Sequence, residues 1–364
     1  MNGNTPFWRR LQPVLAVDGP MLAIVALLMS AGLLTLFSAS ADFPGRFELQ
    51  LRNVLTALLL MWGAANIPPQ ALMRHAAPLY GMGVALLTAV FLFGVTKKGS
   101  TRWLHIGHDF QPSEMMKIAM PMMLAWFFHR ADGARGWQVF VAAAMLLAIP
   151  VGLIAKQPDF GTAMLVLAAG FYVIVLAGLS WRVLAALGVC GAAAVPLVWQ
   201  LLHDFQRQRV LTFLDPGADP MGKGFQITQA MTAIGSGGMT GRGWMDGTQG
   251  RLGFIPERST DFIFSVFAEE FGLLGGIVLL LLYSLLIARG LQIAAGATTR
   301  FSRLLGGAIT MILFTYAFIN IGMVCGVVPV VGVPLPFFSY GGTALGTLGL
   351  GCGILMGIRR QSLA

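Results

Sequence analysis

Long apolar runs separated by short polar segments recur along nearly the whole chain. Ten such runs can be counted, and each approaches the roughly 17 to 25 residues that an α-helix needs to cross about 30 Å of hydrocarbon. They lie near residues 20–39, 50–66, 76–95, 113–129, 138–155, 161–179, 183–202, 261–288, 304–327 and 343–358. The pattern predicts an all-α, polytopic membrane protein with ten transmembrane helices.

One connection between the predicted helices is much longer than the others. Residues 203–260 join the seventh and eighth helices, and loops of this length are usually functional or disordered. This loop has 11 glycines, yet its many apolar residues, among them Trp244 and Phe254, are untypical of a disordered linker. We expect it to fold against the membrane surface, with a short helix over 225–234 that Gly235 ends in a left-handed conformation.

Composition agrees with a membrane location. Apolar residues make up 56% of the chain and charged residues only 11%, and the mean hydropathy is +0.75. We find no internal repeat, low-complexity tract or linker, so we expect one membrane domain over residues 1–364. The first 18 residues carry no small-residue cleavage site, so we expect the first helix, and not a removable signal peptide, to target the chain.

The distribution of arginine predicts the orientation. If the N-terminus is cytoplasmic, the inner segments hold eleven arginines and two aspartates, so the net charge of +9 of the whole chain lies at the inner face. The basic balance therefore indicates topology and not nucleic-acid binding. With ten crossings, both termini are cytoplasmic and the loop 203–260 is extracytoplasmic.

Small residues have structural interpretations. Cys190, Cys325 and Cys352 fall in or beside apolar runs and indicate neither disulfides nor a metal site. Four glycines in the last predicted helix have a spacing that allows close helix packing, namely Gly342, Gly346, Gly349 and Gly353. The glycines at 235–238 complete neither phosphate-loop pattern, which argues against a cytosolic nucleotide site.

Charged groups beside apolar runs are costly, so we ask what each does. In the segment 97–117, Arg102 adds a cation on the outer side. Glu114 and Lys117 are three residues apart and share a helix face, so they form either a structural ion pair or a substrate contact. Asp159 starts the sixth predicted helix, where its role is either an N-terminal cap or a contact to substrate.

Two further places lie in the long loop. Arg207 and Arg209 alternate at its start and either present fork-shaped donors to a phosphate or lie solvated at the headgroups. At its end, Glu257 and Thr260 precede Asp261, which sits at a helix start where an anion is favoured. The alternative for Asp261 is an N-terminal cap.

These candidates share the outer face of the predicted protein. That face offers carboxylates, many cations and neighbouring apolar grooves, which together suit a lipid pyrophosphate. Its phosphates would meet the cations, its tail would lie between helices, and its sugar would meet carboxylate and amide groups.

Several short motifs make the chain similar to a known family, and the similarity runs from about Asp18 to Arg360. They are Arg102-Trp103-Leu104, Gln111-Pro112-Ser113-Glu114 with Lys117, Gln157-Pro158-Asp159-Phe160-Gly161-Thr162, Gln206-Arg207-Gln208-Arg209, Ala233-Ile234-Gly235-Ser236-Gly237-Gly238, Pro256-Glu257-Arg258 with Thr260-Asp261-Phe262, and Val331-Gly332-Val333-Pro334-Leu335-Pro336 with Ser339-Tyr340-Gly341-Gly342. With these motifs the chain resembles the SEDS family of shape, elongation, division and sporulation proteins. The short N-terminus and residues 206–209 are more similar to its elongation members than to its division members.

The resemblance implies ten transmembrane helices with a large outer loop between helices seven and eight. It also implies an inverting glycosyltransferase of the bacterial cytoplasmic membrane that polymerises lipid II, the undecaprenyl-pyrophosphate-linked disaccharide-peptide, during cell elongation. The implied partner is a class B penicillin-binding protein, a transpeptidase, beside other elongation-complex proteins. The family's essential aspartate falls on Asp261, whereas Ser259 stands where some relatives have histidine.

The chemistry explains why one acid would suffice. A pyrophosphate leaves as a stable anion, so only the acceptor hydroxyl needs a base, and Asp261 is the candidate. Arg102, Lys117, Arg207, Arg209 or a divalent cation such as Mg²⁺ or Mn²⁺ would stabilise the departing charge. The alternative function is a lipid II flippase, which should show a continuous polar path near the middle of the membrane.

Overall fold

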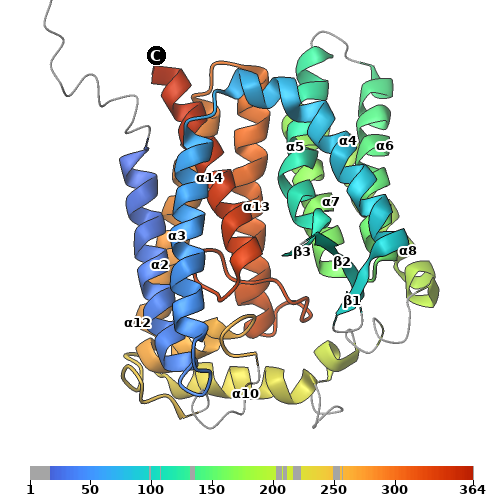
Figure 1. The fold of residues 1–364 in the computed structure, drawn as a ribbon. Helices are drawn as coiled ribbons and strands as arrows, with labels where there is room; N and C mark the ends of the chain where they lie inside the picture. Colours follow the sequence, from blue (N-terminus) through green and yellow to red (C-terminus); the bar gives the residue numbers. More distant parts are fainter. Residues whose placement is uncertain are drawn as a thin grey trace, which may run out of the picture.

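The fold is taken from a computed structural model. It describes residues 17–97, 100–106, 108–131, 136–201, 207, 211–215, 223–248, 255 and 257–363. Within these ranges a long helix overlaps each of the ten predicted apolar runs (Figure 1). The helices are α2 (Gly19–Ala39), α3 (Arg46–Ala65), α4 (Pro69–Phe93), α5 (Pro112–Arg130), α6 (Trp137–Lys156), α7 (Phe160–Leu176), α8 (Trp181–Leu201), α12 (Ile263–Ala295), α13 (Arg300–Val324) and α14 (Gly342–Leu363).

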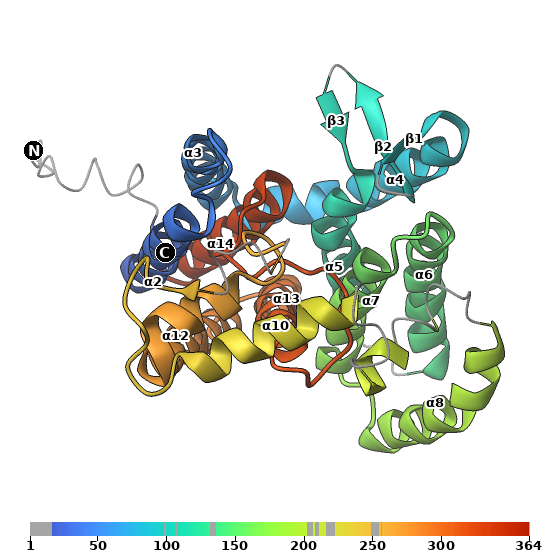
Figure 2. The same ribbon diagram turned by 90° about the horizontal axis from the view of Figure 1, so that it is seen from below.

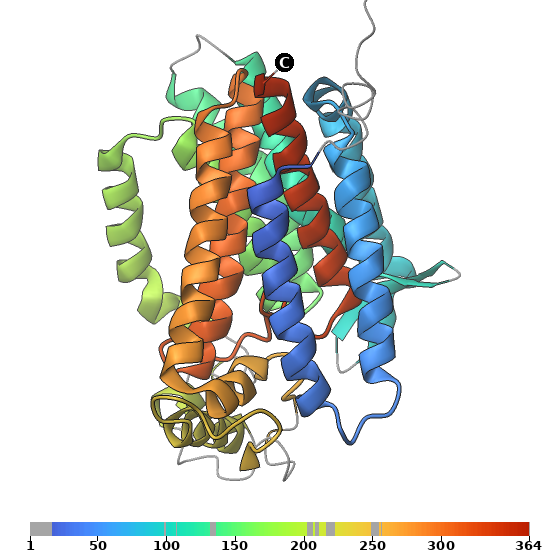
Figure 3. The same cartoon turned by 90° about the vertical axis from the view of Figure 1, so that its left-hand side faces the viewer.

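The chain is a helical membrane protein. Among the described residues, six helices are long and apolar enough to cross a membrane by length and composition, namely α2, α4, α6, α12, α13 and α14. Two shorter apolar helices cover Phe160–Leu176 and Trp181–Leu197. Figure 3 shows α8 standing apart from the rest of the bundle.

Helix α13 is the core of the bundle. It packs against α5, α7, α12 and α14, and it is the most buried of the six long apolar helices. Its close approach to α12 depends on Gly290, because a Cβ atom there would lie 2.4 Å from the Thr310 hydroxyl oxygen. α13 therefore connects helices from both halves of the chain, and polar side chains on it can reach groups far apart in sequence.

The glycines of α14 pack against α3, which confirms the role predicted for them. A Cβ atom on Gly349 would lie 2.8 Å from the carbonyl oxygen of Ala57. On Gly353 it would lie 2.2 Å from that of Met61. Real side chains do not approach a backbone so closely, so these positions require glycine for the two helices to touch.

A small antiparallel sheet lies between α4 and α5, and the sequence analysis did not predict this addition to the all-α architecture. Its strands are β1 (Val95–Lys97), β2 (Ser100–Ile106) and β3 (His108–Phe110), in the order β1-β2-β3. The segment is too polar for a membrane helix and is rich in residues that favour strands, such as Thr101, Trp103 and Ile106. Figure 2 shows the sheet projecting beside α4.

The long loop contains the helix α10 (Lys223–Ser236), which confirms the short helix predicted there. α10 packs against α12 and α13 and crosses beneath them, at the end of the bundle opposite the C-terminus (Figures 1 and 2). The prediction for Gly235 is wrong, because Gly235 is helical and the left-handed residue is Gly238, with φ 53°. The helix runs on to Ser236, the Gly237 amide still donates to the Ala233 carbonyl, and Gly237 then lies against the backbone of Ala268 in α12.

The loop after α10 is fastened to a break in α12. Gly272 has φ 65° within α12, and the amides of Leu273 and Leu274 donate to the carbonyls of Gly238 and Met239. Residues 237–248 thereby form a backbone collar around the break.

Two buried carboxylates on α12 also bind this collar. Glu269 accepts hydrogen bonds from the amide and the hydroxyl of Thr248, at 2.8 and 3.1 Å. Glu270 accepts from the amide of Met245 and from the Ser38 hydroxyl. Such contacts agree with the structural role expected for buried acids in this helix, and they hold the loop against the helix that follows Asp261.

Candidate functional site

Asp261 lies in a turn, residues 257–262, immediately before α12. The other two candidates of this motif close the turn, because the Thr260 hydroxyl donates to a Glu257 carboxylate oxygen at 2.9 Å. The amide of Phe262 donates to the Glu257 carbonyl at 3.2 Å. Phe262 is the N-cap residue of α12, so Asp261 does not occupy the N-cap position that the alternative interpretation gave it.

Neighbouring elements hold the first half of this turn from outside. The buried Arg258 guanidinium donates to the Ala39 carbonyl at 2.7 Å, at the end of α2. The Ser259 hydroxyl accepts from the Arg46 guanidinium at 2.6 Å, and its carbonyl accepts from the Tyr340 amide at 2.9 Å. The turn is thus fixed to both the α2–α3 and the α13–α14 connections.

The second half of the turn is held by α13 and the connection that follows it. The Ser339 hydroxyl donates to the Thr260 carbonyl at 2.6 Å, and the Asn320 amide nitrogen donates to the Asp261 carbonyl at 2.9 Å. The Asp261 side chain is half-buried, and the backbone of Gly332 lies beside its carboxylate. Because its backbone is fixed at successive residues, the direction of the Asp261 side chain is restricted.

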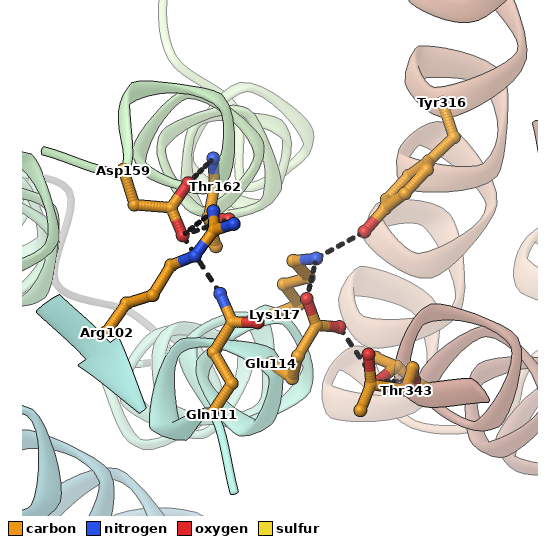
Figure 4. Close-up of polar contacts among 9 residues, drawn as sticks. Arg102, Gln111, Glu114, Lys117, Asp159, Thr162, Tyr316 and Thr343 are labelled. Carbon is orange, nitrogen blue, oxygen red and sulfur yellow. Dashed lines mark hydrogen bonds and ion pairs between the residues drawn. The ribbon is translucent and has the colours of Figure 1, made fainter. Parts of the chain in front are cut away.

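A second polar cluster surrounds Asp159, where α6 turns into α7 (Figure 4). Asp159 is the N-cap residue of α7, accepting from the Thr162 amide at 3.3 Å, so the capping alternative is realised. Its carboxylate also accepts from the Gln111 amide at 2.9 Å and pairs with Arg102 of β2 at 3.4 Å. The Arg102 side chain keeps 30% of its surface exposed. Asp159 can therefore cap α7 while Arg102 remains accessible to a ligand.

A third cluster surrounds Lys117 on α5 (Figure 4). The Lys117 ammonium donates to a Glu114 carboxylate oxygen and to the Tyr316 hydroxyl, both at 2.6 Å. The other Glu114 oxygen accepts from the Thr347 hydroxyl at 3.2 Å. The predicted ion pair is therefore present, and it joins α5 to α13 and α14. A cavity of about 20 Å³ beside it, lined by Lys117, Tyr316 and Thr347 and by apolar side chains, is large enough for about one water molecule.

Helix α13 connects the Lys117 cluster to the Asp261 turn. Tyr316, which binds Lys117, and Asn320, which binds the Asp261 carbonyl, are four residues apart and lie on one face of the helix. The separation along the axis is about 6 Å at about 1.5 Å per residue. Lys117 and Asp261, which are far apart in the sequence, are thus both hydrogen-bonded by residues of α13.

The Asp159 cluster borders the same region. A Cβ atom on Gly161 would lie 3.1 Å from a side-chain carbon of Val331, so the start of α7 contacts the α13–α14 connection directly. Val331 precedes Gly332, which lies beside the Asp261 carboxylate. One end of α13 is therefore surrounded by three clusters, namely the Asp261 turn, the Asp159 cluster and the Lys117 cluster. It is the end nearer α10 in Figure 1.

Of the two candidate arginines at the start of the long loop, the structure describes Arg207. The Arg207 guanidinium donates to the carbonyls of Trp199 and Gln200 at 3.0 and 2.7 Å. These carbonyls belong to the last turn of α8, where a cation is favourable. The structure thus places Arg207 at the end of α8, and these two hydrogen-bond partners belong to none of the three clusters. Arg209 lies outside the described residues.

A divalent cation would need help from the substrate to bind at this site. Among the described residues, no group of three or more His, Cys, Asp or Glu side chains is arranged to hold a metal ion. Mg²⁺ is commonly held by one or two carboxylates together with substrate phosphates, so Asp261 and a pyrophosphate would be the ligands that fit here.

Four residues that build the site were not among the predicted site residues, although Ser339 lies in one of the family motifs. All four lie within or beside apolar runs: Tyr316, Asn320, Ser339 and Thr347. The site residues that they bond are 59 to 233 residues away along the chain. Polar residues inside predicted membrane helices were the available signal, because an uncharged amide or hydroxyl there needs a partner.

Comparison with known proteins gives relatives over nearly the full length. The chain is 47% identical over 354 residues to a protein of Escherichia coli strain K12 named peptidoglycan glycosyltransferase MrdB, covering 97% of this chain and 95% of that protein.

Solved structures have the same fold. One is a chain in a structure described as structural coordination of polymerization and crosslinking by a peptidoglycan synthase complex, with a TM-score of 0.84 and 33% identity over 96% of this chain and 99% of that one. Another is the rod shape determining protein RodA of Thermus thermophilus, with a TM-score of 0.73 and 30% identity over the same shares of the two chains.

A family model described as cell cycle protein, for FtsW, RodA and SpoVE, matches residues 20–363. The match covers the three clusters and the connections between them, and it confirms the resemblance found from the motifs. The chain therefore belongs to the FtsW/RodA/SpoVE family.

Proposed function

We propose that the protein is a peptidoglycan glycosyltransferase that polymerises lipid II into glycan strands during cell elongation. One observation carries the proposal: a carboxylate, Asp261, lies on a turn that five backbone and side-chain contacts immobilise, in a chain 47% identical to a protein named for this activity. A carboxylate held in a fixed position suits general-base removal of the proton from a sugar hydroxyl.

In the proposed reaction, Asp261 accepts the proton of the 4-hydroxyl on the N-acetylglucosamine of one lipid II. That oxygen then attacks the anomeric carbon of the second, lipid-linked sugar and inverts it from α to β. Undecaprenyl pyrophosphate leaves with the electron pair of the broken bond and is already stable as an anion. No acid is needed on the leaving side, so one carboxylate suffices.

Among the candidate cations that the structure describes, Arg102 is the best placed for the leaving pyrophosphate. It is partly exposed and has a carboxylate contact at 3.4 Å, whereas Lys117 is buried and bonds Glu114 and Tyr316, both at 2.6 Å. An arginine can present two parallel donors to a phosphate. Lys117 and Glu114 then act mainly by holding α5 against α13.

The flippase alternative is not favoured. The relative in Escherichia coli is named for glycosyl transfer, and a flippase would need a polar path for a disaccharide and two phosphates. The cavity beside Lys117 has room for about one water molecule and mostly apolar walls.

A test in detergent separates the two activities, because a transporter has no reaction without a membrane to cross. Purified protein is given lipid II in detergent, alone and with a class B penicillin-binding protein. We expect glycan polymer in at least the sample that contains the transpeptidase. If neither sample forms polymer while the protein moves lipid II across vesicles, the proposed function is wrong.

We also propose ten membrane crossings in one membrane domain of the bacterial cytoplasmic membrane, with both termini inside and the site outside. The arrangement of the helices supports this, since the α3–α4 connection and the C-terminus lie at one end of the bundle and α10 lies at the other (Figure 1). A class B penicillin-binding protein and other elongation-complex proteins are the proposed partners, since a similar chain was solved in a peptidoglycan synthase complex.

The orientation predicts which single cysteines an impermeant thiol reagent can reach. Met239, 63% exposed in the collar, and Gln70, exposed at the start of α4, lie at opposite ends of the bundle. In a background without the three natural cysteines, Met239→Cys should be labelled from outside intact spheroplasts, and Gln70→Cys only after lysis. The reverse pattern would invert the proposed topology.

A further inference from the structure

Asn320 is a fully buried polar residue near the end of α13. Its side-chain nitrogen donates to two backbone carbonyls, that of Asp261 at 2.9 Å and that of Val333 at 2.7 Å. One side chain thus joins the turn that carries Asp261 to the connection between α13 and α14.

The chemistry of the bridge calls for a side-chain amide. The NH₂ group has two hydrogens, and two carbonyl acceptors use both of them. A hydroxyl has only one donor and a carboxylate has none. Within the part of the chain that the structure describes, the buried Asn320 oxygen has no hydrogen-bond partner, so the two carbonyls set the orientation of the amide.

The second carbonyl matters because of its neighbour in the chain. Gly332 has φ 81°, and a Cβ atom there would lie 3.3 Å from a carboxylate oxygen of Asp261. The backbone at Gly332 therefore lies beside the acid. By fixing the carbonyl of Asp261 and that of Val333, the residue after Gly332, the Asn320 amide sets the separation between the carboxylate and the backbone beside it.

We propose that Asn320 is a positioning residue that holds the Asp261 carboxylate at the distance and direction needed to accept the proton of the acceptor sugar. This inference rests on the proposed function for its chemical meaning, although the bridge itself is independent of it. The Asn320 amide bonds Asp261 and Val333 through their backbone carbonyls. Its loss should therefore change the rate of the chemical step and leave the affinity for lipid II nearly unchanged.

The expected loss follows from the sensitivity of proton transfer and attack to geometry. A displacement of about 1 Å in a reacting group can lower a rate by roughly 10²-fold. We expect kcat for polymerisation to fall by about 10- to 100-fold when the bridge is removed, with KM for lipid II changed less than about twofold.

The experiment compares Asn320→Leu, which keeps the branch at Cγ but has no donor, with Thr310→Val. Thr310 is a matched control, since it is equally buried on α13 and its hydroxyl bonds only within the helix, to the Gly306 carbonyl. Asn320→Ser keeps one donor and provides a milder variant if Asn320→Leu does not fold. Each protein is purified, its thermal transition is recorded, and kcat and KM are measured with lipid II.

Hydrogen exchange of the backbone supplies a measurement that does not depend on activity. In folded Asn320→Leu or Asn320→Ser, amides of 257–263 and 330–334 should exchange faster than in the parent, whereas Thr310→Val should not differ. Faster exchange together with reduced kcat and unchanged KM supports the inference.

Three results would overturn it: unchanged exchange at both segments, parental kcat in a folded variant with faster exchange, or an equal loss of rate in Thr310→Val. Failure of the proposed function looks different, because the parent itself would then form no polymer while the exchange data still report on the bridge.

Discussion

Replacing Asp261 with asparagine should nearly abolish polymerisation while the protein stays folded. Asparagine keeps the shape of the side chain and most of its hydrogen bonding, but it cannot take up the proton of the sugar hydroxyl at neutral pH. General-base assistance is worth about 10² to 10⁴ in rate, so polymer from lipid II should fall to near the detection limit. Stability should change little, because Phe262, and not Asp261, is the N-cap residue of α12.

The matched control is Asp246→Asn, which makes the same chemical change on an exposed residue of the collar at the same end of the protein. It should retain parental activity. Thermal transitions and copurification with the transpeptidase should be the same for both variants and the parent. A folded Asp261→Asn variant with near-parental polymerisation would remove the base from the proposed mechanism.

Replacing Lys117 with methionine should have the largest effect on stability. Lys117 is 4% exposed and the Glu114 side chain 13% exposed, and among the described residues the removal of Lys117 leaves the Glu114 carboxylate with the Thr347 hydroxyl as its one hydrogen-bond partner. Breaking a buried pair by deleting one partner costs about 3 to 5 kcal/mol in free energy of unfolding. We expect a thermal transition lowered by several degrees and a weakened contact between α5 and α13.

The double variant Lys117→Met with Glu114→Gln identifies the cause. Neutral glutamine removes the unpaired charge, so much of the lost stability should return, since apolar or neutral replacements of a whole buried pair are often tolerated. If the double variant is less stable than Lys117→Met alone, the ammonium contributes through Tyr316 and not through the ion pair.

The length and apolarity of the runs were sufficient to predict the positions of the helices, because a membrane segment needs an uninterrupted apolar stretch. The ends were less predictable. The eighth run was expected to stop at residue 288, yet α12 continues to Ala295. The predicted run stops just before Arg289, whereas in the structure the Arg289 guanidinium lies within the helix, pairs with Asp18 at 2.6 Å and bonds Gln292.

The parts of the candidate site that were predictable from the sequence are those in which charged residues bond partners close to them along the chain. Glu114 and Lys117 pair as their three-residue spacing predicts, and Asp159 caps α7 as its place at a helix start allows. The turn around Asp261 depends on Asn320 and Ser339, which contact it from distant parts of the chain. No local pattern reports such pairings, because neutral polar residues are compatible with many positions in a membrane helix.

The most direct test of the account is to follow bond formation and leaving-group release together in one reaction. Purified protein, with its class B penicillin-binding protein, is incubated with lipid II while polymer and undecaprenyl pyrophosphate are quantified. We predict glycan strands that a muramidase cleaves, with one undecaprenyl pyrophosphate released for each new glycosidic bond, and neither product from Asp261→Asn. Polymer formed equally by Asp261→Asn, or no polymer from the parent protein, would contradict the account.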